Sequence, residues 1–385
     1  MPFGDRLSAF PLTRALLEFD LSEETYAEYD AISFETLCKE SKVSKKLYET
    51  FLKPILLALL FVPPRELSAA AALSVLNNYV LAHQPDFDVQ WPKRSPTEVF
   101  VKWTEILKEK YEATILNSTR VSKVVFDDRK VLGVELDSGT TIGADAIVLA
   151  AGASALPLIL ESSGLDRCKG LCRVSELSCS AVTAVRFSLR KGSAALPLKF
   201  ASNVFSGPRD NIAGTFYDVG SLQGKEAGKT FEVDTYNAGA LMGSSELELE
   251  SAAKEVLSLE NPKFASIDIE GLRVAKVKNA ALRWTPGSHG ATPAMKPEGA
   301  PQGLYIAGDL VKNGPAEFPA HFGARGLSQE KALVTGLQAG VMATKDLNRS
   351  GHSYPLKSIA GPAQVEPDEP HIQAAKNCLR LLKNY

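Results

Sequence analysis

Two apolar segments of the chain end in residues that could hold a ligand. Ala146–Gly152 is a continuous apolar run that finishes in small residues, and Gly303–Asp309 is a second run that finishes in Gly308 and Asp309. Such runs are typical of parallel strands buried on both faces, and α/β proteins bind cofactors at the carboxyl ends of these strands, where small residues let a ligand approach the main chain. We therefore expect Asp309 at this edge, near a phosphate or a polyol.

A helix predicted from Ser328 supplies the third component of this candidate site. The segment from Ser328 to Gly336 opens a helical pattern that continues to about Leu347. The first turn of a helix carries free N–H groups and the positive end of the helix dipole, so it favours anions. The two strand ends and the helix together predict a clamp for an anion or a polyol. The alternative is an ordinary turn at Gly308 and Asp309, followed by an ordinary N-cap at Ser328.

Other reactive side chains form no recognisable catalytic pattern. His289 lies just before the second apolar run, and His321 and Arg325 lie in the loop after it, so they could reach a substrate or a quinone; solvated loop positions are the alternative. Ser154 lacks the Gly-x-Ser-x-Gly frame of a hydrolase nucleophile. No metal site is predicted, because zinc-ligand spacing is absent among the remaining histidines and clustered cysteines: His83, His352, His371, Cys168, Cys172 and Cys179.

Composition excludes several classes of protein. The chain has 385 residues, enough for two or three domains, and its 43 Lys and Arg nearly balance its 45 Asp and Glu, so a nucleic-acid partner is not predicted. The longest apolar run, Ile55–Val62, is far shorter than the ~20 residues of a membrane-spanning helix. The N-terminus lacks a signal or transit pattern, and five scattered cysteines favour a reducing compartment such as the cytoplasm.

Residues up to about 111 have helical periodicity. Val43–Leu60 and Ser68–Ala82 predict two apolar helices, and the alanines of the second predict close packing against a neighbour. The sequence Ser95-Pro-Thr-Glu98 combines an N-cap, a proline at the first helical position and a capping-box glutamate. It predicts a helix over Pro96–Tyr111 with its apolar side chains facing inward: Val99, Trp103, Ile106 and Leu107.

From Ala113 onward the pattern changes to the alternation of β-strands. Short strands are predicted at Thr114–Leu116, Arg120–Phe126 and Val131–Leu136. Between the two apolar runs we expect a helix near Glu246–Leu259 and alternating strands over Val182–Leu189, Thr230–Tyr236 and Leu272–Val277. The chain is therefore predicted to form an α/β layer interrupted by a mostly antiparallel insertion.

The motifs at the candidate site resemble those of a known superfamily. Gly303-Leu-Tyr-Ile-Ala-Gly-Asp309 followed by Ser328-Gln-Glu-Lys-Ala-Leu-Val-Thr-Gly336 resembles the carboxyl-terminal FAD motif of the flavin amine oxidase and phytoene desaturase superfamily. Val121–Gly152 is similar to the family's segment in which a strand meets the FAD adenine. The helical region, with Ser33-Phe34, Pro54, and Glu66-Leu67-Ser68-Ala69, looks like that of plant-type carotenoid desaturases. The resemblance covers about residues 30 to 345.

This resemblance implies a fold and a domain organisation. The fold class would be α/β, with a partial FAD-binding Rossmann-like layer, a β-rich substrate-domain insertion and an N-terminal helical lobe. The implied segments are the helical lobe at 1–94, the FAD-binding domain at 95–165 and 285–347, the substrate domain at 166–284, and a linker with a C-terminal helix at 348–385. FAD would be bound by Val121, Ala150, Gly152, Gly308, Asp309, Ser328, Gln329 and Glu330.

The implied activity is FAD-dependent oxidation, with hydride abstraction from an apolar isoprenoid as in phytoene and zeta-carotene desaturases. A quinone or oxygen would accept the electrons, and the location would be a plastid membrane surface. An apolar channel or membrane-facing patch would be lined by helical residues whose alternative role is plain core packing: Phe51, Leu56, Leu59, Phe61, Leu76 and Tyr79. The alternative within the superfamily is an amine oxidase, for which Trp284 and Tyr217 are the aromatic candidates.

Two departures from the family pattern bear on the cofactor. The sequence contains no Gly-x-Gly-x-x-Gly, the turn that holds the FAD pyrophosphate in this family, and Lys331 replaces the glycine of the second motif. We therefore expect the chain to bind FAD poorly. It would be either a truncated product of a flavoprotein gene or a flavin-free paralogue that acts as a noncatalytic binding protein.

Overall fold

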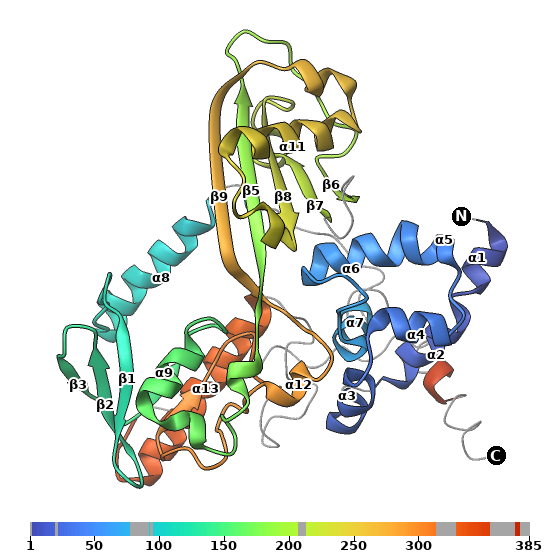
Figure 1. The fold of residues 1–385 in the computed structure, drawn as a ribbon. Coiled ribbons are helices and arrows are strands. Elements are labelled where there is room, and N and C mark those ends of the chain that lie inside the picture. The colour runs from blue at the N-terminus through green and yellow to red at the C-terminus, as the bar shows by residue number, and fades with distance from the viewer. Residues whose placement is uncertain are drawn as a thin grey trace.

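The computed structural model describes residues 2–19, 22–77, 92, 95–206, 213–312, 329–354 and 374–377. Figure 1 shows three parts: a lobe of helices formed by the N-terminal segment, an antiparallel sheet covered by a helix, and a smaller α/β layer. Strands β5 (Cys179–Leu189) and β9 (Ile269–Leu282) run from the antiparallel sheet toward the smaller layer. Within the described ranges, no helix has the length and apolar character needed to cross a membrane.

The N-terminal lobe is helical, as predicted. Every residue of α7 (Ala69–Leu76) is buried, because its alanines let α2, α3 and α4 pack closely around it. The apolar segment predicted over Val43–Leu60 forms α5, the π-helical turn η1 and α6, and ends at Phe61 in the left-handed conformation. The elements are α1 (Phe3–Leu7), α2 (Phe10–Glu18), α3 (Glu23–Asp30), α4 (Phe34–Glu40), α5 (Lys45–Leu47), η1 (Tyr48–Leu52) and α6 (Lys53–Leu60).

Helix α8 (Pro96–Tyr111) begins where the capping signal placed it, with the Ser95 side chain accepting a hydrogen bond from Thr97 N. The expected inward face is wrong: Val99 and Trp103 are each 47% exposed, and Ile106 and Leu107 are similarly accessible. Figure 1 shows α8 standing apart from the core of the α/β layer. The apolar side chains of α8 are therefore not covered by another described element, although their spacing is that of an amphipathic helix.

The smaller layer contains the two strands predicted from apolar runs. β4 (Ile147–Leu149) and β10 (Leu304–Ile306) pair in parallel. All of β10 is buried, but Val148 of β4 is 40% exposed, so the expected burial on both faces holds for β10 only. Beside them lie β1 (Val121–Phe126), β2 (Val131–Leu136) and β3 (Thr141–Gly143), an antiparallel sheet, with α9 (Leu156–Ser163), η3 (Leu165–Arg167), η4 (Val174–Glu176), α12 (Ser288–Ala291) and α13 (Gln329–Arg349). The strand expected at Thr114–Leu116 does not form.

The insertion is an antiparallel sheet, as predicted, with the strand order β6-β7-β8-β5-β9. The molecule has a second hydrophobic core between this sheet and α11, and it contains Phe187 and Phe231. Helix α11 begins with a capping box formed by Ser245 and Glu248. The remaining elements are β6 (Ser202–Ser206), β7 (Ala213–Asp218), α10 (Val219–Leu222), β8 (Thr230–Tyr236), η5 (Ala238–Leu241), α11 (Glu246–Ser258) and η6 (Pro262–Ser266). This core is separate from the core of the helical lobe and the α/β layer, which form one cluster.

Candidate functional site

The parallel pair β4 and β10 brings the two predicted strand ends to one sheet edge. Leu304 pairs with Ile147 and Ile306 with Leu149, and Ala307 N continues the ladder with a hydrogen bond of 3.0 Å to Leu149 O. Because parallel strands run in the same direction, the residues after Leu149 and after Ala307 leave the sheet on the same side. The pairing that the candidate site requires is therefore present.

The side chain of Thr335 joins helix α13 to Gly308 at this edge. Thr335, which is 3% exposed, accepts a hydrogen bond from Gly308 N at 3.0 Å and donates to the Lys331 carbonyl at 2.8 Å. Gly308 has φ +130°, a conformation that favours glycine, so the chain can turn here and present the next residue, Asp309. Asp309 is half-buried, and its charge attracts Lys331. Burial, together with the Asp309 charge, raises the pKa of Cys179. The strand end and the first turns of α13 thus form one local unit.

The sequence-predicted residues occupy different parts of this region. Ala150 and Gly152 follow β4 and are exposed, and a Cβ added at Gly152 would meet no atom within 4 Å, so a ligand has room to approach the main chain there. Gln329 is exposed and Glu330 follows it at the start of α13. Val121 begins β1, in the separate three-stranded sheet, where it pairs with Leu136. Ser328 lies outside the described residues, as do His83, His321, Arg325, His371 and Tyr79.

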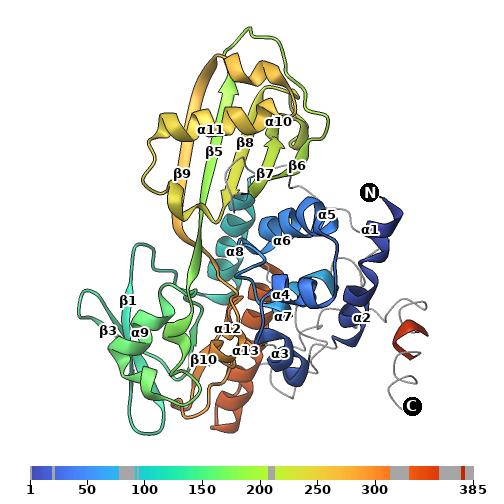
Figure 2. The same cartoon turned by 45° about the vertical axis from the view of Figure 1, so that its right-hand side comes forward.

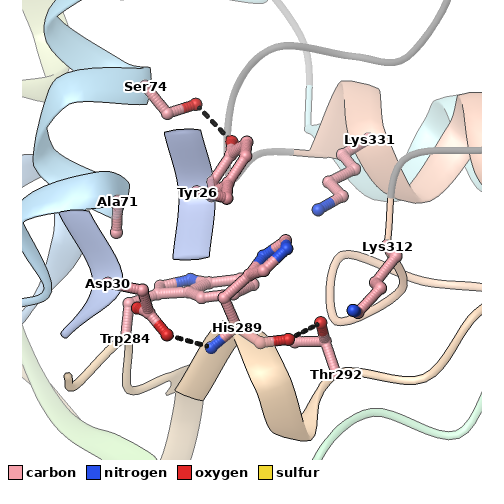
Figure 3. Close-up of a pocket in the computed structure, with 9 residues that line it drawn as sticks. All are labelled: Tyr26, Asp30, Ala71, Ser74, Trp284, His289, Thr292, Lys312 and Lys331. Carbon is pink, nitrogen blue, oxygen red and sulfur yellow. Dashed lines mark hydrogen bonds between the residues drawn. The ribbon is translucent and has the colours of Figure 1, made fainter. Parts of the chain in front are cut away.

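A pocket lies next to the first turns of α13 (Figure 3). The pocket and the solvent region at its mouth together contain about 390 Å³ of empty space. The lining comes from α3, α7, the segment after β9, α12, the loop after β10 and α13: Tyr26, Asp30, Ala71, Ser74, Trp284, His289, Thr292, Lys312 and Lys331. Figure 2 shows α3 and α7 of the helical lobe facing α12 and α13, so the pocket forms where the lobe meets the α/β layer.

Two carboxylates beside the pocket are held by internal partners. Glu23 accepts hydrogen bonds from His289 Nε2 at 3.2 Å and Lys312 Nζ at 3.1 Å, and these partners lower its pKa to about 2. Asp30 accepts from Ser68 Oγ at 2.5 Å and His289 N at 3.0 Å. Burial nevertheless raises the pKa of Asp30. These contacts join α3 to α12 and to the loop after β10, and so they fix the walls of the pocket.

Aromatic rings supply the remaining walls. Tyr26 stacks on His289 with ring centres 4.3 Å apart, and its hydroxyl donates to Ser74 Oγ at 3.0 Å. Burial raises the pKa of Tyr26 to about 12, so its hydroxyl stays protonated at neutral pH. Trp284 is 6% exposed and also lines the pocket. Of the two aromatic candidates named from the sequence, Trp284 therefore lies at the site, whereas Tyr217 is on β7 in the antiparallel sheet and is not among the lining residues.

Lys331 is the most unusual group in the pocket. Its side chain is buried, its Nζ lies 5.4 Å from the centre of the Trp284 ring, and no hydrogen-bond acceptor contacts Nζ in the described part of the chain. Burial lowers the pKa of Lys331 to about 8, against the opposing attraction of Asp309 and Glu23. The ammonium therefore remains largely protonated at pH 7 in a place where an ion is costly to bury.

The expected apolar channel is not formed as one surface. Leu56 and Leu76 are buried in the core, and Phe51 and Leu59 are exposed by 46% and 37%. Phe61 packs against Tyr236 of the antiparallel sheet with ring centres 4.4 Å apart. These side chains therefore lie in the packed core or on the surface and do not line one channel. The pocket is lined on the α7 side by Ala71 and Ser74.

The residues present fit part of a flavin dinucleotide. The open space at Gly152, the half-buried Asp309 and the start of α13 suit the hydroxyl and phosphate oxygens of a polyol chain. The sequence offers no Gly-x-Gly-x-x-Gly turn for a pyrophosphate. Among the described residues, no group of His, Cys, Asp and Glu could hold a metal ion.

Comparison with known proteins shows which enzymes have a similar fold. Residues 96–175 match a family model described as GMC oxidoreductase. The chain has the fold of flavin-dependent oxidoreductases. It is similar to wild-type putrescine oxidase bound to putrescine, with 13% identity, a TM-score of 0.62, and coverage of 91% of this chain and 77% of that one. No curated protein sequence matches.

Two further solved structures share this fold. Cyclohexylamine oxidase from Brevibacterium oxydans is 15% identical, with a TM-score of 0.59 and coverage of 91% of this chain and 76% of that one. An oxidoreductase from Methanosarcina mazei is 17% identical, with a TM-score of 0.61 and coverage of 88% and 73%. Similarity at this low sequence identity shows a shared fold. The substrate must be argued from the residues of the site.

Proposed function

We propose that the chain is an FAD-dependent oxidoreductase that removes a hydride from a carbon atom of an apolar, isoprenoid-like substrate. One observation carries the cofactor part of this proposal: the parallel pairing of β4 with β10, which places Gly152 and Asp309 at one sheet edge beside α13. This is the place where α/β folds hold nucleotide cofactors. The fold shared with known oxidoreductases supports the same conclusion.

Bound FAD would supply the hydride acceptor. Asp309 would accept hydrogen bonds from hydroxyl groups of the cofactor, and the main chain at Gly152 and Gly308 would allow close approach without a side chain in the way. Thr335 would keep Gly308 and α13 in register with each other. The pocket would hold the part of the substrate that is oxidised.

The charges of the pocket bear on the substrate. Lys331, Lys312 and Asp30 line it. Lys312 is paired with Glu23, and Asp30 accepts hydrogen bonds from Ser68 and His289 N, so a substrate with a cationic amine would meet the ammonium of Lys331. Trp284, Tyr26 and Ala71 offer apolar contact surface. These features support a substrate without an amine, and they favour the isoprenoid proposal over amine oxidation.

The resemblance of the helical region extends the proposal to the cellular setting. A quinone or oxygen would accept electrons from the reduced cofactor, and the protein would work at a plastid membrane surface. Both statements rest on the resemblance alone.

The test is anaerobic reduction of protein-bound FAD, followed as bleaching of the flavin absorbance near roughly 450 nm. We expect phytoene, whose short conjugated system does not absorb in the flavin band, to bleach the flavin when it is presented in lipid vesicles, and benzylamine to leave it oxidised. Bleaching by benzylamine alone would replace the proposal with amine oxidation. Absence of any saturable FAD binding would instead favour the flavin-free binding protein.

A further inference from the structure

The pocket contains a buried cation that forms no ion pair with the residues that the structure describes. Lys331 is 7% exposed, and among these residues its Nζ lies beside the face of Trp284, 5.4 Å from the ring centre. Neither Asp309 nor Glu23 forms a hydrogen bond with it, although both act on it electrostatically. A buried ammonium normally pairs with a carboxylate or with several hydrogen-bond acceptors, because the interior cannot replace its hydration otherwise.

Of the carboxylates nearby, Glu23 and Asp30 are already engaged, and Asp309 attracts Lys331 without a hydrogen bond to it. Glu23 accepts from both His289 and Lys312, and Asp30 accepts from Ser68 and from the main chain of His289. Neither can turn toward Lys331 without giving up these bonds. The charge of Lys331 is therefore left for a molecule that enters the pocket.

The direction of the side chain supports this assignment. Figure 3 shows Lys331 projecting from α13 into the pocket, with its nitrogen facing the space between Tyr26, His289 and Trp284. Lys312 lies at another side of the same space, where it is paired with Glu23. A negatively charged group entering there would meet the free ammonium directly and would have aromatic surface beside it.

We propose that this pocket binds the carboxylate of a small organic acid, with Lys331 as its ionic partner. Trp284, Tyr26 and Ala71 would contact the apolar atoms next to the carboxylate. As a ligand site the pocket stands independently of the flavin. Only the further statement that the bound acid is the substrate rests on the proposed function, and it would make the substrate an apolar molecule with an acidic end.

The experiment uses the full chain without added FAD and propionate as the probe. Binding is measured as the shift of the urea unfolding midpoint and as the change in tryptophan fluorescence, at constant ionic strength. We expect saturable stabilisation by propionate and no effect of its neutral isostere propionamide, because a ligand that binds only the folded state raises its stability. Lys331→Met should weaken propionate binding at least about tenfold, since a charge-assisted hydrogen bond is lost.

The control is Lys225→Met, which removes an exposed lysine in the loop before β8 and should leave propionate binding unchanged. Lys331→Gln is the second variant, and it should lose binding as Lys331→Met does while keeping a polar side chain. Equal binding of propionate and propionamide, or full propionate affinity in both Lys331 variants, would overturn the proposal. These outcomes do not depend on flavin, so failure of the anion site and failure of the oxidoreductase assignment are separable.

Discussion

At the scale of single residues, Lys331 stands out because it costs stability. Its pKa falls from 10.5 to about 8 on folding, so below pH 8 the folded protein carries an ammonium that would be better solvated in the unfolded chain. A buried group that carries such a cost is a candidate for function. The sequence marked Lys331 only as a departure from a motif, and its burial follows from the tertiary packing of α13 against the helical lobe.

We predict that Lys331→Met stabilises the protein at neutral pH. The lowered pKa of Lys331 corresponds to a loss of about 3 kcal/mol in the free energy of unfolding, and this loss is fully present below pH 8. Between pH 8 and 10.5 the unfolded chain binds more protons at this group than the folded one, so wild-type stability rises with pH and the advantage of the variant shrinks. Urea unfolding of the wild-type and Lys331→Met proteins at pH 7 and pH 10.5 measures the difference in their free energies of unfolding. The same difference at both pH values would contradict the account.

Gly152 gives a second prediction at this scale. An added Cβ meets no protein atom within 4 Å, so Gly152→Ala should change the free energy of unfolding by less than about 0.5 kcal/mol. If a cofactor lies against this main chain, the same methyl group should weaken FAD binding about tenfold. Equilibrium unfolding and flavin fluorescence titration give the two values. Unchanged FAD affinity in a normally folded variant would remove Gly152 from the site.

Part of the site could be foreseen from residue patterns and part could not. The paired strand ends at Gly152 and Asp309 follow from two apolar runs that finish in small residues, a local signal. Tyr26, Asp30 and Glu23 lie in a helix with no chemical motif, and they reach the pocket because α3 packs against α12. Contacts between residues more than 250 positions apart, such as Glu23 with His289, leave no trace in local periodicity.

At the scale of elements, the junction between β10 and α13 positions the site. Among the described residues, Thr335 is its only side-chain link to Gly308, through the hydrogen bond that its hydroxyl accepts from Gly308 N at 3.0 Å. The helix could be predicted from sequence, but its attachment could not, because a threonine within a helix usually bonds to its own preceding turn. Thr335 makes that bond too, to the Lys331 carbonyl.

Thr335→Val should therefore loosen this junction. The variant keeps the shape of the side chain and leaves Gly308 N without its acceptor, which should lower the free energy of unfolding by about 1–2 kcal/mol. Thr335→Ser keeps the hydroxyl and is the matched control, expected to recover most of the loss. Urea denaturation of the wild-type, Thr335→Val and Thr335→Ser proteins measures their free energies of unfolding. Equal stability of the valine and wild-type proteins would show that the hydrogen bond does not hold α13 in place.

Strands and helices with strong local signals were predicted well. β2 occupies the predicted residues Val131–Leu136, β8 occupies Thr230–Tyr236, and α11 begins at Glu246 after its capping box. The orientation of α8 was predicted wrongly, because an apolar stripe says which face would be buried and gives no information on whether another element covers it.

At the scale of the whole molecule, the pocket exists because the helical lobe meets the α/β layer. The lobe contributes α3 and α7, and the layer contributes α12, α13 and Trp284 in the segment between β9 and α12. The long strands β5 and β9 carry the antiparallel sheet away from this junction and lead the chain back into it. The class of fold was predictable from the order of apolar runs and alternating strands, whereas the meeting of the lobe with the layer required the structure.

The central claim is that the edge formed by β4 and β10 binds FAD. The direct measurement is a flavin fluorescence titration of the wild-type chain, of Asp309→Ala, and of Asp128→Ala, an exposed carboxylate in the β1–β2 turn. Because the Gly-x-Gly-x-x-Gly turn is absent, we predict weak saturable binding with a Kd on the order of 10–100 μM. Affinity should fall about tenfold or more in Asp309→Ala and stay the same in Asp128→Ala. Absence of saturable binding, or equal affinity in all three proteins, would contradict the account.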